Sequence, residues 1–448
     1  MKRRHLAAVL TAGALLAGGL TACSAGDDTD GDGPITITLL EYQQSRADLM
    51  AELIPEFEAA MAAEGKEIEV ELIADILTDG DFRTKVTQQL HAGTAPDVID
   101  TGGSNITGWA AAGYLLELDS YLDDWSDWDT FYDVSRDRAL HSDGHYYSVP
   151  HEASLQHLFV RKDVLDEMGI DSAQPETWDE LIERLKAVQA ITGEAPIVIP
   201  AGTAWGGGTW TEGFLPIVGG TGSTLYDPKD GTWTVESDGL TASFELFAEL
   251  TEAGLMPVEA LLNPNPWEPT KYEAFPAGTL PVAAQGTWGW RYDWGPEGTA
   301  PIEDVQEKVI TWNYPALVDG TEPYSVSGGG FNFAVNAESA HPEAAMELVK
   351  WLSTGEALAT QLAVVGAASP REGISELEPY ASEPTLLDAE EKLQTSIAPP
   401  IGEGADQISQ AVQNATEKIL TGDADGKQAA EQFAKEVRDF LDPSLIAK

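Results

Sequence analysis

The chain has 448 residues, 43% hydrophobic and 22% charged, and its 75 acidic against 25 basic residues give a formal net charge of −50. This length is sufficient for two lobes with separate cores. The charge excludes a conventional nucleic-acid-binding protein, which needs a cationic surface, and it excludes acidic lipid surfaces as partners. Apolar and aromatic residues run along the whole chain, so we expect the acidity on a solvated surface rather than in a disordered tail.

The N-terminus carries the pattern of an export signal followed by a tether. Basic residues at positions 2–4 precede an uncharged stretch over 6–20, which is too short for a comfortable membrane span. The sequence Leu20-Thr21-Ala22-Cys23 then resembles the lipobox of bacterial lipoproteins, in which the cysteine is acylated and becomes the new N-terminus. We therefore expect a signal peptide over 1–22 and a lipidated linker over 23–33. The alternative is an ordinary secretory signal cleaved near an alanine.

Strands that alternate with amphipathic helices follow this N-terminal region. Alternating apolar residues predict strands over 35–39 and 68–72, and Ala95-Pro96-Asp97-Val98-Ile99 predicts a short buried strand. Apolar residues at helical spacing predict one helix from Leu49 to Gly65 and another around Phe82. This alternation is typical of parallel βαβ units, so the predicted fold class is α/β.

A second series of strands and helices begins at Leu155. The first strand covers 155–160, and Thr177 with Glu180 forms a capping box that begins a helix ending at Gly193. The remaining predicted elements are strands at 197–199, 281–284 and 331–335, a Gly- and Trp-rich loop over 202–213, and helices at 239–254, 342–352, 405–420 and 427–441. These elements predict a second α/β lobe.

Several short motifs occur along the chain in a recognisable order. They are Ala95-Pro96-Asp97-Val98, Tyr147-Ser148-Val149-Pro150, Pro175-Glu176-Thr177-Trp178, Gly286-Thr287-Trp288-Gly289-Trp290 and Gly328-Gly329-Gly330-Phe331-Asn332. Together with the lipobox, they resemble the extracellular solute-binding proteins of bacterial sugar ABC importers, the maltose-binding-protein-like group. The resemblance implies two α/β lobes joined by a hinge, with the ligand in the cleft between them. It assigns 34–150 and 284–334 to the first lobe, and 151–283 and 335–448 to the second.

Aromatic residues near a predicted strand end are the first candidates for ligand binding. A carbohydrate presents apolar C–H faces and a rim of hydroxyls, so its site needs aromatic platforms beside hydrogen-bonding side chains. Trp288, Trp290 and Arg291 supply both after the strand at 281–284, and Trp205 in the Gly-rich loop is the opposing candidate. A core position is the alternative for each tryptophan, as it is for Trp294.

Polar candidates lie after the ends of other predicted strands, where open α/β sheets bind ligands. They are Tyr42, Gln43, Ser104, Asn105 and Glu152. The family resemblance implies that Ser104 and Asn105 contact the ligand from the first lobe and that Glu152 is an acid near the hinge. It also places Arg371 where the family approaches the cleft again. For each single polar residue the alternative is a helix cap or a surface loop.

No pattern of catalytic residues stands out. His141, His145, His151 and His157 lie close together in sequence, but strand alternation and an intervening turn do not place them around one metal, so we expect no metal site. The chain has neither a Gly-x-Ser-x-Gly elbow nor a Gly-Lys-Ser/Thr phosphate loop. With 75 carboxylates, a pair at glycosidase separation would carry no information. We therefore expect neither catalysis nor a cofactor.

These observations together predict a lipid-anchored solute-binding protein. It would capture a carbohydrate, expected to be an oligosaccharide, and deliver it to the permease subunits of an ABC transporter in the membrane. We expect a monomer that is extracytoplasmic and held to the outer face of the cell membrane by the lipid on Cys23 alone. The alternatives are a surface-anchored polysaccharide hydrolase and a receptor for polyamines or peptides.

Overall fold

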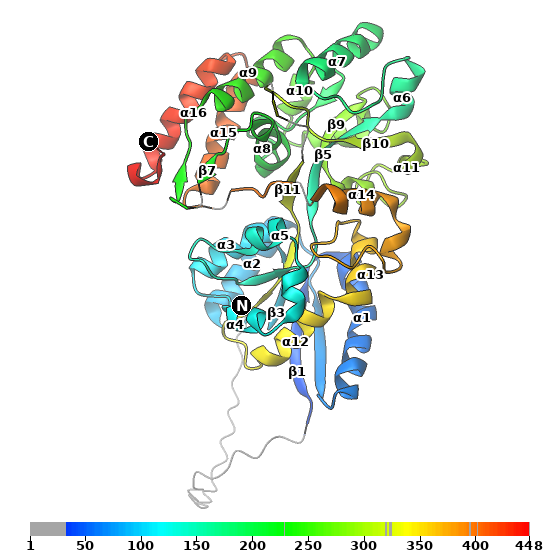
Figure 1. Cartoon of the computed structure of the whole chain (residues 1–448), viewed down its shortest axis with the longest axis vertical. Helices are drawn as coiled ribbons and strands as arrows, with labels where there is room; N and C mark the ends of the chain where they lie inside the picture. The colour runs from blue at the N-terminus through cyan, green and yellow to red at the C-terminus, as the bar shows by residue number, and fades with distance from the viewer. Residues whose placement is uncertain are drawn as a thin grey trace, which may run out of the picture. The chain divides into compact units, whose positions relative to one another are not determined.

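The computed structural model describes residues 33–447 except 228, 319, 322–324, 394–395 and 401. The predicted signal peptide and Cys23 lie outside the described residues. Residues 35–448 form one compact unit, whose helices and strands gather around two sheets (Figure 1). None of the helices in the described part of the chain is long and apolar enough to span a bilayer.

The first sheet has the strand order β2-β1-β3-β12-β4. β1 (Ile35–Glu41) runs parallel to β2 (Ile68–Ala74) and to β3 (Val98–Gly102), which confirms the predicted parallel start of the fold. β12 (Phe331–Val335) is antiparallel to both β3 and β4 (Ser148–Pro150). The chain therefore returns from far downstream to complete this sheet.

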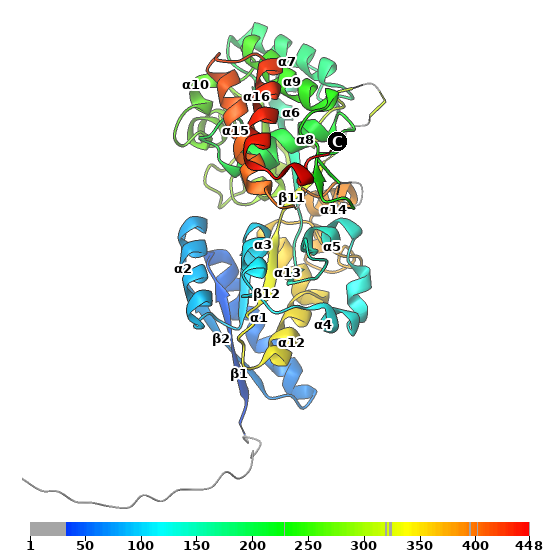
Figure 2. The same cartoon turned by 90° about the vertical axis from the view of Figure 1, so that its left-hand side faces the viewer.

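Helices cover both faces of the first sheet (Figures 1 and 2). On one face, α1 (Gln44–Ala63) and α12 (Pro342–Leu352) share a core with alternate residues of the strands. On the other face, α2 (Asp79–Ala92) and α3 (Gly103–Ala111) pack against the intervening strand residues. α13 (Gly355–Val365) packs beside α1. This sheet and its helices form the first lobe.

The second sheet has the order β10-β5-β9-β6, and β11 also pairs with β5. β5 (Ser154–Arg161) is antiparallel to β9 (Val282–Gly286), β10 (Val309–Trp312) and β11 (Val326–Gly329). Among the strand pairs described in this sheet, β9 with β6 (Ile197–Val198) is the parallel one. The predicted strands at 155–160, 197–199 and 281–284 are confirmed, but they form a mixed sheet.

The largest apolar core belongs to this second lobe. α7 (Trp178–Thr192) begins as predicted, with the Thr177 hydroxyl accepting the Glu180 N–H, and ends at a left-handed Gly193. α9 (Asp238–Glu252), α15 (Ala405–Leu420) and α16 (Gly426–Phe440) pack against one another (Figure 2). The predicted helices at 239–254, 405–420 and 427–441 are thereby confirmed.

The predicted loop over 202–213 is wrong in its last part. The chain there forms the π-helix η2 (Thr209–Phe214), in which Trp210 stacks on Phe214 at a centroid distance of 6.2 Å and both rings enter the core. A second π-helix, η3 (Glu268–Ala274), lies in the same lobe. The other described elements are α4 (Asp119–Asp123), η1 (Ser126–Thr130), α5 (Asp133–Ala139), α6 (Lys162–Glu167), α8 (Leu215–Gly219), β7 (Tyr226–Asp227), β8 (Thr232–Trp233), α10 (Val258–Leu261), η4 (Thr287–Trp290), α11 (Val305–Lys308), η5 (Tyr380–Ser382), α14 (Pro384–Leu393) and η6 (Pro443–Leu445).

The predicted lobe boundaries need correction after residue 283. Because β9, β10 and β11 all pair with β5, most of 284–334 belongs to the second lobe, and only β12 returns to the first. Conversely, α12 and α13 pack on the first lobe, although the family resemblance assigns 335–448 to the second. The chain thus passes between the sheets at 151–153, at Gly330 and between α13 and α15.

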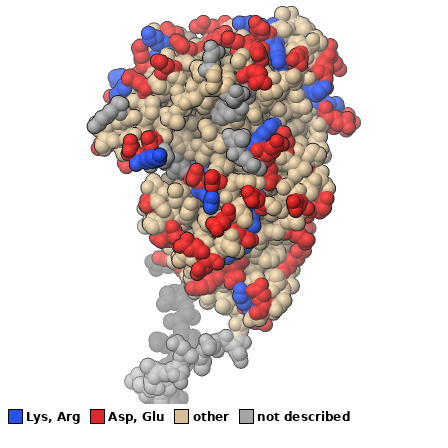
Figure 3. Space-filling view, in the orientation of Figure 1, with Lys and Arg blue, Asp and Glu red and all other residues tan. Residues whose placement is uncertain are grey.

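Acidic side chains are spread widely over the face seen in Figure 3, with few basic ones among them. This distribution agrees with the expected solvated acidic surface.

Candidate functional site

The carboxyl end of β3 in the first sheet lies beside two of the crossings between the sheets. Gly102, the last residue of β3, is opposite Phe331, and the Gly103 N–H donates to the Gly330 carbonyl at 3.2 Å. The His151 N–H donates to the Phe331 carbonyl, also at 3.2 Å. Residues after β3 are therefore held at the junction of the lobes.

The carboxyl end of β9 in the second sheet reaches the same junction. Gly286, the last residue of β9, is opposite Gln156 near the start of β5, and the Leu155 N–H donates to the Thr287 hydroxyl at 3.4 Å. Because β5 begins directly after the first crossing, the residues that follow β9 lie close to it. Strand ends of this kind are where open α/β sheets bind ligands.

Five buried ionisable side chains occupy the junction, and we call them the junction network. They are Glu41, Arg46, Asp100, His151 and Glu152, each no more than 4% exposed. Arg46 Nη2 lies 2.5 Å from Glu152 Oε2, and its Nη1 lies 3.8 Å from Asp100 Oδ2. His151 Nε2 is 2.8 Å from the other Asp100 oxygen. Arg46, Asp100, His151 and Glu152 are paired in this way, which allows their charges to be buried.

Arg46 connects α1 to both crossings. Its guanidinium binds Glu152 in the first crossing and lies 3.8 Å from the ring centroid of Phe331, at the second. Glu152 reaches the second crossing as well, because its Oε1 accepts the Phe331 N–H at 3.0 Å. The predicted hinge acid is thus found at the junction, in a position that fixes the path of the backbone.

Burial and charge shift the pKa values within the junction network in opposite directions. Burial and the neighbouring Asp100 raise the pKa of Glu41 well above its ordinary value, against the opposing effect of Arg46. For Asp100, burial is outweighed by His151 and Arg46, so its pKa is lowered. Glu41 therefore keeps its proton at pH values where an exposed glutamate has lost it.

Replacing Glu41 with Gln is expected to raise the melting temperature more at pH 8 than at pH 4.5. The folded protein binds a proton at Glu41 that the unfolded chain releases above a pKa of about 4.3, so stability falls as pH rises. Glutamine carries no proton to lose and removes this dependence. Thermal unfolding at the two pH values measures the effect, with Glu69→Gln, at an exposed position of β2, as the control. An equal change at both pH values would contradict the assignment.

A second buried group, the second-lobe cluster, consists of Glu212, Lys271, Gln285 and Asp293. Lys271 Nζ lies 2.6 Å from Glu212 Oε2 and 2.9 Å from Gln285 Oε1, and the Gln285 amide donates to Asp293. Burial raises the pKa of Asp293, and Lys271 only partly opposes this shift. Glu212 lies on η2 and Lys271 on η3, so the two π-helices face each other across this ion pair. Such helices frequently occur at functional sites.

The predicted aromatic residues occupy different environments. Trp288 is half-buried, and its ring lies directly over Gly286, where an added Cβ would come within 1.9 Å of a ring atom. Trp205 is 8% exposed, with Lys271 Nζ 5.0 Å from its ring centroid and Trp267 edge-on at 6.4 Å. Trp290 packs on Phe159 inside the second-lobe core, so the structure places it as a core residue.

The second-lobe cluster lies beside Trp205 and Trp267, because its Lys271 contacts the Trp205 ring and its Gln285 is near the carboxyl end of β9. Trp294 is fully buried, and its indole N–H donates to the Lys271 carbonyl at 2.8 Å. The core alternative for Trp294 is therefore confirmed. Arg291 is half-buried, forms an ion pair with Glu383 at 2.7 Å and packs its side chain against Gly366.

The predicted polar residues of the first lobe differ in exposure. Tyr42 is buried, stacked on Phe82 at a centroid distance of 3.9 Å. Gln43 is half-buried and its Oε1 accepts the Arg46 Nε–H at 3.0 Å, which brings it to the junction network. Ser104 is exposed in the first turn of α3.

Asn105 and Arg371 have structural partners in the first lobe. Asn105 is buried, with its carbonyl accepting the Arg83 Nε–H at 2.7 Å and its amide donating to the Thr101 hydroxyl at 2.9 Å. Arg371 is buried, paired with Asp127 at 3.2 Å, and donates to the Ser353 carbonyl at 3.1 Å. The structure thus gives both side chains protein partners.

The four neighbouring histidines do not form one cluster. His151 belongs to the junction network, and His157 is buried in β5, where burial lowers its pKa well below its ordinary value. His141 and His145 lie on either side of the turn at residues 142–144, and belong neither to the junction network nor to β5.

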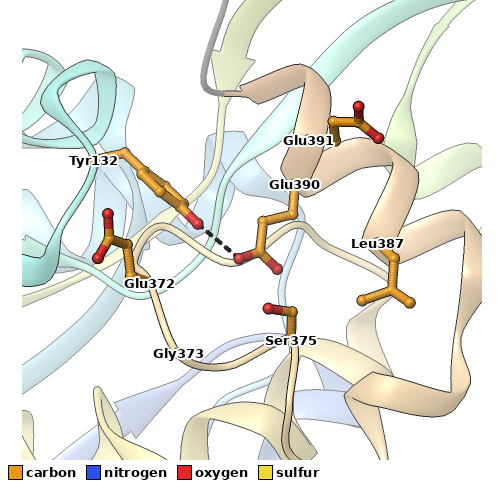
Figure 4. Close-up of a pocket in the computed structure, with 7 residues that line it drawn as sticks. All are labelled: Tyr132, Glu372, Gly373, Ser375, Leu387, Glu390 and Glu391. Carbon is orange, nitrogen blue, oxygen red and sulfur yellow. Dashed lines mark hydrogen bonds between the residues drawn. The ribbon is translucent and has the colours of Figure 1, made fainter.

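A cavity of about 350 Å³ lies elsewhere in the chain, and Figure 4 shows the residues that line it. It is lined by Tyr132, Glu372, Gly373, Ser375, Leu387, Glu390 and Glu391. The Tyr132 hydroxyl donates to Glu390 at 2.7 Å across it. None of the predicted ligand-binding residues lines this cavity.

Sequence reasoning missed Arg46, Glu212 and Lys271. A signal for Arg46 exists, because it shares the helix face of Leu49 and Leu53, which are buried. Glu212 and Lys271 carry no comparable signal, since their partnership depends on two π-helices far apart in the chain.

The fold and the junction define a two-lobe binding protein, and comparison with known proteins agrees. The chain belongs to the bacterial extracellular solute-binding proteins, whose family model matches residues 44–359. The predicted family membership is thereby confirmed.

Two curated relatives are similar to this chain. The arabinooligosaccharide-binding protein of Halalkalibacterium halodurans is 23% identical over 312 residues, which cover 67% of this chain and 64% of that protein. The multiple sugar-binding protein of Streptococcus mutans is 22% identical over 313 residues, or 66% and 67% of the two chains. The match to the first relative therefore spans slightly less than two thirds of its length.

Two solved structures share the fold. The GacH receptor of Streptomyces glaucescens has a TM-score of 0.73 at 18% identity, with 91% of this chain and 98% of that chain covered. The cyclic alpha-maltosyl-1,6-maltose binding protein of Arthrobacter globiformis has a TM-score of 0.74 at 21% identity, with 91% and 99% covered. These matches confirm the predicted two-lobe α/β fold.

Proposed function

We propose that this protein is the substrate-binding component of an ABC importer and that it captures a carbohydrate, an oligosaccharide, between its lobes. The observation that carries the proposal is the half-buried Trp288 ring, which follows β9 at the junction and lies against Gly286. A ring in this position offers an apolar platform to the C–H face of a sugar. The names of the curated relatives, which refer to arabinooligosaccharides and to multiple sugars, support the same class of ligand.

Several predicted residues are proposed as ligand contacts from opposite sides. Trp288 and the edge of Trp205 would contact the sugar from the second lobe, and Gln43 and Ser104, which retain exposed surface, from the first. Trp290, Asn105 and Arg371 would act by supporting the fold, given their buried contacts. A ligand that touches both lobes favours the closed arrangement, as in periplasmic binding proteins generally.

A thermal-shift screen of the mature protein tests this function. The panel contains monosaccharides, oligosaccharides of several linkages, and spermidine for the polyamine alternative. A ligand present at 100 times its dissociation constant adds about 2.7 kcal/mol of stability, which gives a clear shift. Stabilisation by spermidine but by no sugar would contradict the proposal.

We propose that the bound sugar is released unchanged to permease subunits in the membrane and that the protein works as a monomer. Mass spectrometry of a stabilising oligosaccharide after prolonged incubation distinguishes this role from the hydrolase alternative. A shortened sugar, or new reducing ends, would contradict the role of a transport receptor.

The lipid anchor on Cys23 is part of the proposal, and Cys23→Ser is expected to release the processed protein from the membrane. The sequence before Cys23 supports acylation, and a thioether-linked lipid would be the sole attachment. Fractionation of cells that produce each form measures the distribution. If the processed variant still sediments quantitatively with membranes, another attachment must exist.

A further inference from the structure

Glu117, Asp119 and His145 form a group of potential metal ligands on the first lobe, apart from the junction. One ligand atom from each residue lies within 4.8 Å of the others. His145 Nδ1 is 3.4 Å from Asp119 Oδ1 and 3.6 Å from Glu117 Oε1. Both are ion-pair distances, and neither contact is a hydrogen bond.

The two distances from His145 are close to the spacing of ligands around a tetrahedral metal ion. With metal–ligand bonds of about 2.1 Å, neighbouring ligands of a tetrahedral Zn²⁺ lie about 3.4 Å apart. His145 Nδ1 is also shielded from solvent and has no hydrogen-bond partner among the described residues. This nitrogen and one oxygen of each carboxylate therefore lie close enough together to bind one ion.

The backbone holds the three side chains in place without the metal. The Leu118 N–H donates to the Tyr146 carbonyl at 2.8 Å, so the segments at 117–119 and 145–146 lie side by side. Leu118 is fully buried and is the N-cap of α4, so the chain on either side of it is anchored where Glu117 and Asp119 come close to His145.

A second hydrogen bond between the same two segments orients Asp119. The Tyr146 N–H donates to its Oδ2 at 3.0 Å, which leaves Oδ1 directed toward His145. Tyr146 is itself fixed by edge-on packing against Trp128 at 5.2 Å. Outer partners of this kind commonly orient the ligands of metal sites.

We propose that Glu117, Asp119 and His145 bind a divalent transition-metal ion of the Zn²⁺ class. One imidazole and two carboxylates suit such an ion better than Ca²⁺ or Mg²⁺, which prefer oxygen ligands alone. Water would supply the remaining coordination, since the group lies at the surface. Binding here is independent of sugar capture at the junction.

Isothermal titration of the metal-stripped protein with ZnCl₂ at pH 7.5 tests the site. We expect one Zn²⁺ per chain, and at least tenfold weaker binding in His145→Gln and in Asp119→Asn. The matched control is His91→Gln, which removes an exposed histidine on α2 that contacts the Tyr114 hydroxyl at 3.1 Å. The control should bind Zn²⁺ as the unaltered protein does.

The outcomes separate a metal site from a simple ion pair or from a diffuse acidic surface. Unchanged Zn²⁺ affinity in His145→Gln, or no binding in the unaltered protein, would overturn the proposal. Equal affinity for Ca²⁺ and Zn²⁺ would do so too, because it would leave the imidazole without a role. A Zn²⁺-dependent rise in melting temperature that His145→Gln abolishes would support it even if titration heats are small.

Discussion

Replacing Arg46 with methionine is expected to lower the free energy of unfolding by about 3–5 kcal/mol, the usual cost of removing one partner from a buried ion pair. The substitution leaves Glu152 and Asp100 in the junction without their shared cation, while the methionine stem can still cover Phe331. Both carboxylates are almost completely buried, so water cannot replace the lost contacts. Urea unfolding followed by tryptophan fluorescence measures the change.

A matched control is the exposed ion pair of Arg438 with Glu236, at 2.7 Å on the second lobe. Arg438→Met should cost only about 0–1 kcal/mol, because solvent screens surface pairs. Adding Glu152→Gln to Arg46→Met should recover part of the loss, since it removes one of the unpaired charges. Equal small losses at Arg46 and Arg438 would show that the junction network does not stabilise the fold.

Replacing Trp288 with alanine is expected to weaken sugar binding at least about tenfold, or 1.4 kcal/mol, while the protein stays folded. A stacked aromatic ring contributes about 0.5–1.5 kcal/mol beyond its buried area, and alanine loses both contributions. The ring is half-buried, so its removal leaves no large internal cavity. Calorimetry with a sugar identified by thermal shift measures the affinity.

Gly286→Ala offers a sharper version of the same test. The backbone at Gly286 has φ −80°, which alanine adopts readily, but the new methyl group would clash with the Trp288 ring and displace it. Affinity should fall although the tryptophan is retained. Trp351→Ala is the control, since Trp351 is also half-buried but packs on Phe57 in the first lobe. Unchanged affinity in both Trp288→Ala and Gly286→Ala would place the sugar elsewhere.

The elements could be predicted from sequence where local signals were strong. The N-cap at Thr177, the left-handed glycine at Gly193 and the proline that begins α12 each fixed a helix end. The predicted capping box is only half formed, because the Glu180 side chain accepts the Glu176 N–H and not that of Thr177. The strands at β1 and β12 followed from apolar patterns of the right length. These signals depend on neighbouring residues alone, and therefore survive without knowledge of the tertiary structure.

The partners of each strand could not be predicted in this way. The pattern at 281–284 identifies a buried strand, but only its pairing with β5 and β6 shows that β9 belongs to the second lobe. Register between distant segments depends on the whole chain, which explains the error in the lobe boundaries. The π-helices were missed for a similar reason, because their buried faces are set by the core around them.

Two members of the junction network, Glu41 and Arg46, could have been recognised from the sequence. Glu41 continues the alternation of Ile37 and Leu39, so a carboxylate occupies a position on the buried side of β1. Arg46 likewise interrupts the apolar face of α1. Two opposite charges at apolar positions five residues apart indicate a buried ionic group, although the identity of Asp100 and Glu152 as further members needs the structure.

The position of β12 in the middle of the first sheet constrains the order in which the protein can form. β12 lies between β3 and β4, yet every named strand of the second sheet precedes it in the chain. During synthesis, the edges of β3 and β4 that face β12 stay open until residue 335 has been added. A product that ends earlier, even one with every strand of the second sheet, would therefore expose unpaired strand edges and be prone to aggregation.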